Sequence, residues 1–155
     1  MNQMFMREAI RISIEKMRRN EGGPFGAVVV RGGRVVGRGW NRVTSSCDPT
    51  AHAEVVAIRD ACRRLKRFQL ADCDLYTSCE PCPMCLGSVY WARIRCVYYG
   101  NTRRDAARIG FDDSLIYHEI SRPLSKRKIP MKRLLHEEAL VAFDEWERKP
   151  DKVPY

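Results

Sequence analysis

The order of its hydrophobic patterns is the feature that most constrains what this chain can fold into. Apolar residues recur at helical spacing over residues 3–19, and two β-rich runs follow at 25–30 and 34–40. The Gly32-Gly33 pair between these runs is typical of a hairpin turn. Strand-like and helix-like segments then alternate to the end of the chain. This order predicts an α/β domain in which helices cover both faces of a mixed sheet.

The later elements follow from the same periodicities and from the turn residues between them. Asp48 and Thr50 are typical caps for a helix that starts near Ala51, and Pro83 suits the first turn of the next helix. We expect helices over 51–65, 83–92, 102–109, 112–119 and 137–148, and strands over 74–77, 95–99 and 129–135.

Length and composition predict one globular domain over residues 1–155. The chain has 155 residues and is 45% hydrophobic, which is enough to bury a core. Its longest apolar run, residues 26–30, is far shorter than the roughly 20 residues that cross a bilayer. The first eleven residues already follow a helical pattern with charges and do not resemble a secretory signal, so we expect a cytoplasmic protein.

The cysteines favour a metal site over a disulfide framework. There are seven, an odd number, and three of them are closely spaced at Cys79, Cys82 and Cys85. Clustered thiols in a reducing compartment indicate metal binding. The other four are interpreted as small core residues; they are Cys47, Cys62, Cys73 and Cys96.

The charge of the chain raises the question of a nucleic-acid partner. Lys and Arg number 28 against 19 Asp and Glu, a formal charge of +9, and many of the basic residues lie between 93 and 133. Such a surplus attracts polyanions. Because the sequence contains no RNA-binding motif, a solvated basic surface is the favoured interpretation, and nucleic acid is not the favoured partner.

Two short segments carry the residues suited to metal chemistry. His52 lies at the start of one predicted helix, and Cys82 and Cys85 lie at the start of another. A catalytic zinc takes three protein ligands and keeps its fourth position for water, and it accepts imidazole and thiolate together. The positive end of a helix dipole also helps to keep thiolates deprotonated. We therefore expect one Zn²⁺ held by these three side chains.

Glu54 completes the predicted reaction centre. It lies two positions after His52, within reach of the metal-bound water, where a carboxylate can take a proton from that water and return it to a substrate. A His-x-Glu segment followed by Pro-Cys-x-x-Cys is the signature of zinc-dependent nucleobase deaminases. The predicted activity is hydrolytic removal of an exocyclic amine by a zinc-activated hydroxide, with Glu54 as the proton shuttle.

Three other interpretations of the thiols remain to be weighed. Cys82 and Cys85 could form a redox pair, but this would leave His52 unexplained. The three closely spaced thiols could also belong to an iron–sulfur cluster motif, but the fourth Cys followed by Pro that this motif requires is missing. The serious rival is a closed structural zinc with Cys79 as fourth ligand. In that case Glu54 would be an ordinary helix residue.

Four longer blocks resemble the zinc deaminases of the cytidine-deaminase superfold, and more narrowly the bacterial guanine deaminases of that fold. They are GGPFGAVVV (22–30), NRVTSSCDPTAHAEVVAIR (41–59), LYTSCEPCPMCLGSVYWAR (75–93) and GFDDSLIY (110–117). The resemblance implies a three-layer α/β/α fold around a five-stranded mixed sheet. It also implies a homodimer that exchanges C-terminal segments, about residues 129–155.

The same resemblance assigns roles residue by residue. It gives the zinc to His52, Cys82 and Cys85 and the proton shuttle to Glu54. The positions that it assigns to base binding are Phe25, Asn41, Ala53, Trp91 and Asp113, with Tyr155 as a lid from the neighbouring subunit. Asp112 lies beside Asp113, so which of the two faces the base stays open, and Pro154 stiffens the segment before the lid.

Guanine, converted to xanthine and ammonia, is the substrate that this resemblance implies. The leading alternative is a wobble-adenosine deaminase of tRNA, which the basic surface favours. Guanosine, cytosine, pterins and triazines stay open as alternative substrates, because the shape of the pocket decides among such amino-heterocycles. A zinc-stapled RNA-binding module without catalysis is the alternative from another class.

Overall fold

The computed structural model describes residues 2–154 and divides into two compact units, Met1–Ser114 and Leu115–Tyr155. The first unit contains the predicted zinc ligands, the predicted proton shuttle and the predicted base-binding residues of the chain itself. Tyr155, the predicted lid, lies outside the described residues.

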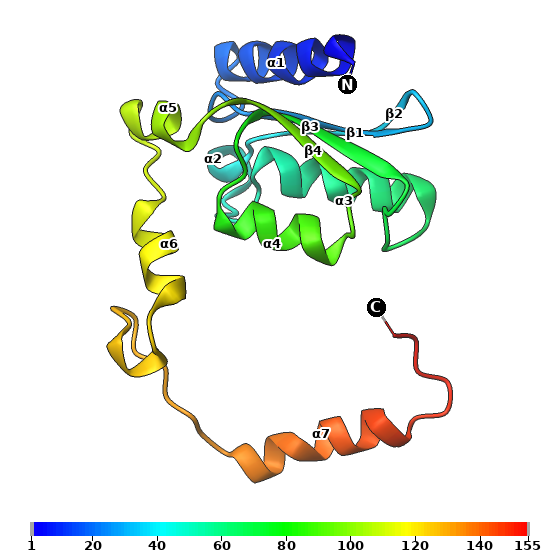
Figure 1. Cartoon of the computed structure of the whole chain (residues 1–155), viewed down its shortest axis with the longest axis vertical. Helices are drawn as coiled ribbons and strands as arrows, with labels where there is room; N and C mark the ends of the chain where they lie inside the picture. Colours follow the sequence, from blue (N-terminus) through cyan, green and yellow to red (C-terminus); the bar gives the residue numbers. More distant parts are fainter. Residues whose placement is uncertain (1, 155) are drawn as a thin grey trace. The chain divides into compact units, whose positions relative to one another are not determined.

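The first unit is a three-layer structure around a four-stranded mixed sheet (Figure 1). The strand order is β2-β1-β3-β4, with β1 antiparallel to both β2 and β3, and β3 parallel to β4. One helix lies on one face of the sheet and two lie on the other. The strands are β1 (Gly26–Arg31), β2 (Arg34–Trp40), β3 (Cys73–Cys79) and β4 (Cys96–Asn101), and the covering helices are α1 (Gln3–Arg18), α3 (Ala53–Leu65) and α4 (Pro83–Trp91).

The central position of β1 explains why its sequence is almost entirely apolar. Alternate side chains of a strand point to opposite faces, and a strand covered on both faces has to be apolar at every position. Ala27 and Val29 belong to the core cluster that contains α3 residues, whereas Val28 and Val30 pack with Phe5 of α1. The five residues from Gly26 to Val30 therefore build two cores at once.

Close packing of β2 on α3 fixes where the N-terminus of that helix lies. A Cβ added at Gly39 would lie 2.1 Å from the carbonyl oxygen of Ala53, so no side chain fits between strand and helix there. Asp60 of α3 adds a polar clamp, because its carboxylate accepts the backbone N–H of Arg38 at 3.0 Å. Burial works to raise the pKa of Asp60, but hydrogen bonds from Arg38, Arg64 and Arg63 outweigh it and hold the pKa below its usual value.

Most elements agree with the sequence prediction, but α3 begins differently. The helix starts at Ala53 and its N-cap is His52, whose side chain makes no capping hydrogen bond. Asp48 does not cap the helix as expected. Its Oδ1 instead accepts the backbone N–H and the hydroxyl of Thr50, at 2.8 and 2.6 Å, and so stabilises the preceding loop. The N-cap position is thereby left to His52.

The expected fifth strand is wrong for the described residues. Residues 129–135 form no ladder, and the sheet has four strands within 2–154. Pro130 has no N–H to donate, and Ile129 and Leu134 are 77% and 81% exposed, so this stretch makes none of the contacts that hold a strand in a sheet.

Short helices make up much of the remaining structure. The predicted C-terminal helix is confirmed as α7, and helices also form close to the ranges expected near 102–109 and 112–119. Residues 43–46 lie outside the expected helices and form one helical turn. These elements are α2 (Val43–Ser46), α5 (Arg103–Arg108), α6 (Ser114–Ser121), the 3₁₀ turn η1 (Leu124–Lys126) and α7 (His136–Arg148). None of the helices in the described chain combines the length and apolarity needed to cross a membrane.

A matched pair of glycine substitutions tests the role of the β2–α3 approach. Gly39→Ala should destabilise the fold by about 2 kcal/mol or more, because the added Cβ forces strand and helix apart. Gly87→Ala, on α4 where nothing lies within 4 Å of the added Cβ, should be neutral or stabilising by about 0.5–1 kcal/mol. Urea unfolding measures both. Equal stability of the two variants would contradict this role of Gly39.

Candidate metal centre

Two helix N-termini converge to form the metal centre. His52 is the N-cap of α3 and Cys82 is the N-cap of α4, and neither side chain makes a capping hydrogen bond. Pro83 follows Cys82 in the first turn of α4, where its fixed φ and missing N–H cost nothing. The N-cap side chains are therefore directed to each other rather than to their own helices, and both helix dipoles present their positive ends to the site.

The geometry of the three side chains fits a zinc ion. The Nδ1 atom of His52 lies 3.5 Å from the Sγ atom of Cys82 and 3.5 Å from that of Cys85, and all three donor atoms lie within 4.8 Å of one another. Zinc–sulfur bonds of about 2.3 Å and zinc–nitrogen bonds of about 2.0–2.1 Å give a tetrahedron with edges of about 3.5–3.8 Å. Both nitrogen–sulfur distances thus match an edge of such a tetrahedron.

The thiols of the pair differ in their acid strength. Hydrogen bonds from Cys85 and His52 stabilise the Cys82 thiolate and lower its pKa to about 4, although burial opposes this. The same hydrogen bond to Cys82, together with burial, raises the pKa of Cys85. A cation at the centre of the three atoms would remove this asymmetry, because it favours thiolate at both positions.

Glu54 is buried beside this centre, as the predicted proton shuttle should be. Its side chain is 6% exposed; Oε1 accepts a hydrogen bond from the hydroxyl of Thr77 at 3.1 Å, and Oε2 lies 3.4 Å from the sulfur of Cys85. Burial raises the pKa of Glu54, which suits a group that has to gain and lose a proton near neutral pH. Sequence reasoning missed Thr77, because a threonine inside a strand carries no functional signal.

Cys79 does not join the three ligands. Within the described residues, the group of side chains that could hold a metal consists of His52, Cys82 and Cys85. The sulfur of Cys79 instead lies 3.7 Å from the backbone carbonyl of Thr102, and burial raises its pKa to about 11. The closed four-ligand site considered from the sequence therefore has no support from this arrangement.

Phe25 and Asn41 lie together in the loop region at the end of the sheet. The Oδ1 atom of Asn41 accepts the backbone N–H groups of Gly23 and Val43, at 3.4 and 3.3 Å. This assignment directs the amide Nδ2 donor away from the backbone. Phe25 packs edge-on against Phe111, with ring centroids 4.9 Å apart. Phe111 is a second residue that the sequence did not single out.

The structure distinguishes the two neighbouring aspartates. Asp112 accepts the backbone N–H of Ser114, the first residue of α6, at 2.9 Å, which is an Asx turn. Asp113 is partly buried, and its pKa is raised by this burial and by the negative charge of the nearby Cys82 thiolate. Asp113 is therefore the carboxylate on the side of the metal centre.

Ala53 and Trp91 occupy very different positions. Ala53 is fully buried between His52 and Glu54 as the first residue of α3. Trp91 is 71% exposed at the last residue of α4, nine residues from Cys82, or about 13 Å at 1.5 Å per residue. Within one chain, α4 thus separates Trp91 from the metal ligands, and its role in base binding stays a prediction.

Zinc content tests which thiols hold the ion. Wild-type protein should contain about one zinc per chain, and Cys85→Ala should lose most of it, because two protein ligands bind zinc far more weakly than three. Cys79→Ala is the matched control and should keep the wild-type zinc content. Elemental analysis, with circular dichroism to confirm folding, measures both. Equal loss of zinc in both variants would indicate a four-ligand structural site.

The chain has relatives among characterised deaminases. Residues 1–101 match the cytidine and deoxycytidylate deaminase zinc-binding region. The guanine deaminase of Bacillus subtilis is 49% identical over 154 residues, covering 99% of each chain. Its X-ray structure matches with a TM-score of 0.97 at 50% identity, covering 100% of this chain and 99% of that one. A tRNA-specific adenosine deaminase of Buchnera aphidicola is 34% identical over 110 residues, covering 71% of this chain and 70% of the relative. This chain belongs to the cytidine and deoxycytidylate deaminase zinc-binding family.

Proposed function

We propose that this protein is a zinc-dependent guanine deaminase that converts guanine and water to xanthine and ammonia. The observation that carries the proposal is the buried Glu54 carboxylate beside three predicted zinc ligands whose donor atoms lie within 4.8 Å of one another. Similarity to a guanine deaminase over almost the whole chain selects the substrate, whereas the adenosine deaminase of tRNA matches over a shorter part.

The residues divide the chemistry between them. When zinc is bound by His52, Cys82 and Cys85, it lowers the pKa of its water ligand from about 15.7 toward about 7. Glu54 takes a proton from water and delivers it to ring N3 of guanine, which makes C2 electrophilic. After the oxygen adds to C2, Glu54 takes the remaining proton of that oxygen and gives it to the amine; the C2–N bond breaks, ammonia leaves and the oxygen becomes the C2 carbonyl of xanthine. Proton transfer of this kind contributes about 10²–10⁴ in rate.

Thr77 prepares Glu54 for this task. By donating to Oε1, the threonine hydroxyl fixes the carboxylate plane and leaves Oε2 to exchange the proton. Thr77 is itself 1% exposed, so the pair is sheltered from bulk water. A carboxylate held this way loses little orientational freedom when the substrate binds.

Complementary hydrogen bonds explain how the base would be held. Guanine has acceptors at O6 and N7 and donors at its ring N–H and its amine. The Nδ2 donor of Asn41 suits the first group and the Asp113 carboxylate suits the second, while Phe25 offers a flat apolar contact. Ala53 and Trp91 complete the set that we assign to the base, and Tyr155 is assigned as the lid.

The protein is further proposed to be a single deaminase domain that forms a homodimer with exchanged C-terminal segments, about residues 129–155. None of the residues 115–154 is buried. The apolar side chains of Leu134 and Phe143 are 81% and 74% exposed. Apolar side chains exposed to this degree along an amphipathic helix favour burial against another chain. A molar mass of one chain in light scattering, over a range of protein concentrations, would contradict the dimer.

We place the protein in the cytoplasm, where its free thiols stay reduced.

A base panel tests the proposed activity directly. Ammonia release should be fast with guanine and at least about 100-fold slower with guanosine, cytosine or a tRNA anticodon stem, because these ligands lack the matching edge or the matching size. Coupled spectrophotometry measures each rate. Preference for the anticodon stem would make the chain a tRNA deaminase, and no release from any base together with tight RNA binding would make it a binding module.

Replacing the shuttle separates chemistry from metal binding. Glu54→Gln should keep about one zinc per chain and lose at least about 10²-fold in kcat, because the amide cannot carry the proton. Zinc content and guanine turnover are measured on the same sample. Turnover close to wild type in this variant would remove Glu54 from the mechanism.

The neighbouring aspartates offer a matched test of base recognition. Asp113→Asn should lower kcat/KM for guanine about 10- to 100-fold, because an amide replaces a charged acceptor. Asp112→Asn should stay within about twofold of wild type, because asparagine also accepts the backbone N–H of Ser114. Equal losses in the two variants would show that Asp113 has no special role.

A further inference from the structure

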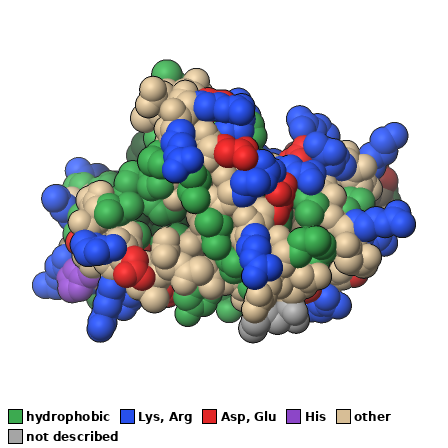
Figure 2. Space-filling model, turned by 90° about the horizontal axis from the view of Figure 1, so that it is seen from above, with side chains coloured by type: hydrophobic (Ala, Val, Ile, Leu, Met, Phe, Trp, Pro, Cys, Tyr) green, Lys and Arg blue, Asp and Glu red, His purple; other side chains and the backbone are tan. Residues whose placement is uncertain are grey.

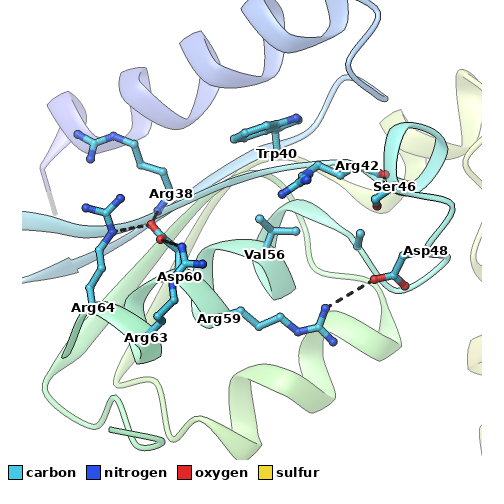
Figure 3. A pocket seen from close by; sticks show the side chains of 11 residues that line it. Arg38, Trp40, Arg42, Ser46, Asp48, Val56, Arg59, Asp60, Arg63 and Arg64 are labelled. Carbon is cyan, nitrogen blue, oxygen red and sulfur yellow. Dashed lines mark hydrogen bonds and ion pairs between the residues drawn. The ribbon is translucent and has the colours of Figure 1, made fainter. Parts of the chain in front are cut away.

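A cavity separate from the metal centre lies between β2 and the outward face of α3 (Figure 3). Its volume is about 610 Å³, and it is lined from three sides by β2, α3 and the segment that includes α2. None of the zinc ligands and neither Glu54 nor Asp113 belongs to its lining. The proposed deamination therefore leaves this cavity without a role.

Arginine dominates the lining of the cavity. Five guanidinium groups face two carboxylates, Asp48 and Asp60, so the lining has three more positive charges than negative ones. In Figure 3 the basic side chains approach from β2 and from α3, with Val56 on the floor between them. The arginines are Arg38, Arg42, Arg59, Arg63 and Arg64.

The two carboxylates do not neutralise this charge. Asp60 is already shared by Arg63 at 2.8 Å, Arg64 at 2.9 Å and the backbone N–H of Arg38. Asp48 uses one oxygen for Thr50, and its other oxygen is 3.7 Å from Arg59, a long ion pair. Outside the lining, Glu8 pairs with the side chain of Arg38 at 3.2 Å and with that of Arg11 at 2.9 Å.

Arg42 has the clearest unused binding capacity in the lining. In the described chain, Arg42 has no carboxylate partner, and its guanidinium lies 5.4 Å from the ring centroid of Trp40. The indole Nε1 of Trp40 is buried and has no hydrogen-bond acceptor within residues 2–154. The binding capacity of the lining therefore rests on its guanidinium groups.

We propose that this cavity binds the phosphate groups of a small phosphorylated ligand. Guanidinium groups match phosphate oxygens with paired N–H donors, and five of them line this cavity. A phosphate near Arg59 would also replace the long contact to Asp48 with a shorter, stronger one.

A compact ligand fits better than a nucleic-acid strand. The two aspartates lie inside the lining, where they would repel a continuous backbone, whereas one or a few phosphates can avoid them. On the face of the molecule in Figure 2, Lys and Arg side chains are spread widely, with acidic groups among them, and do not form one continuous track. The cavity, in contrast, gathers five arginines in one hollow.

Calorimetric titration of the zinc-loaded protein tests the proposal with inorganic phosphate and uridine triphosphate as probes. The triphosphate carries no purine and should bind without being displaced by guanine. Arg42→Gln and Arg59→Gln should each weaken its binding about tenfold or more, because each removes charge-assisted hydrogen bonds. Inorganic phosphate should compete with the triphosphate, since both would use the same arginines.

Arg104→Gln is the control, because it removes the same charge from α5, outside the cavity lining. It should change the affinity less than about twofold, within the range of a screened surface charge. Equal weakening by Arg104→Gln, displacement by guanine, or no binding at millimolar triphosphate would each overturn the proposal. Much tighter and steeply salt-dependent binding of an RNA oligonucleotide at these arginines would overturn it in favour of RNA. Guanine turnover is measured separately, so failure of this site leaves the deaminase proposal standing.

Discussion

The site depends on the convergence of two helix N-termini. His52 and Cys82 each occupy an N-cap position, where a polar side chain would normally bond to its own helix. Here the two side chains face each other at 3.5 Å, and Cys85, one turn into α4, closes the triangle. Three donor atoms at this spacing favour a tetrahedral cation, and the helix dipoles support the thiolates that such a cation requires.

The sheet holds these helix ends in place. The glycines of β2 let α3 approach the strand closely, and Asp60 ties the helix to the backbone of the same strand. In the same sheet, Thr77 of β3 donates a hydrogen bond to Glu54 of α3. The neighbouring Ser78 accepts the backbone N–H of Gly26 at the start of β1. The reacting carboxylate is thus fixed by the same strands that form the core, so site and fold are stabilised together.

Sequence reasoning identified the parts of this structure whose pattern is local. The apolar run of β1, the helical spacing of α1 and the paired ligand motifs all have a clear periodicity or spacing. The start of α3 was predicted wrongly, because Asp48 resembles a cap in sequence but bonds to Thr50 instead. The fifth strand was predicted wrongly, because β-branched and apolar residues at 129–135 do not supply a neighbouring strand edge.

Other features depend on contacts between residues far apart in the chain. Thr77 and Glu54 are 23 positions apart and meet only because β3 lies under α3. Asp112 bonds to the backbone N–H of Ser114, whereas Asp113 is the carboxylate near Cys82, a difference that no sequence pattern reveals. The arginine-lined cavity likewise combines residues 38–64 through the packing of β2 on α3.

The central claim is that three protein side chains hold the zinc and leave one position for water. X-ray absorption spectroscopy of the zinc-loaded protein measures this most directly. The account predicts two sulfur ligands at about 2.3 Å and two nitrogen or oxygen ligands at about 2.0–2.1 Å, one of them from solvent. Three sulfurs and one nitrogen, with no oxygen ligand, would show a closed structural site and contradict the proposed catalysis.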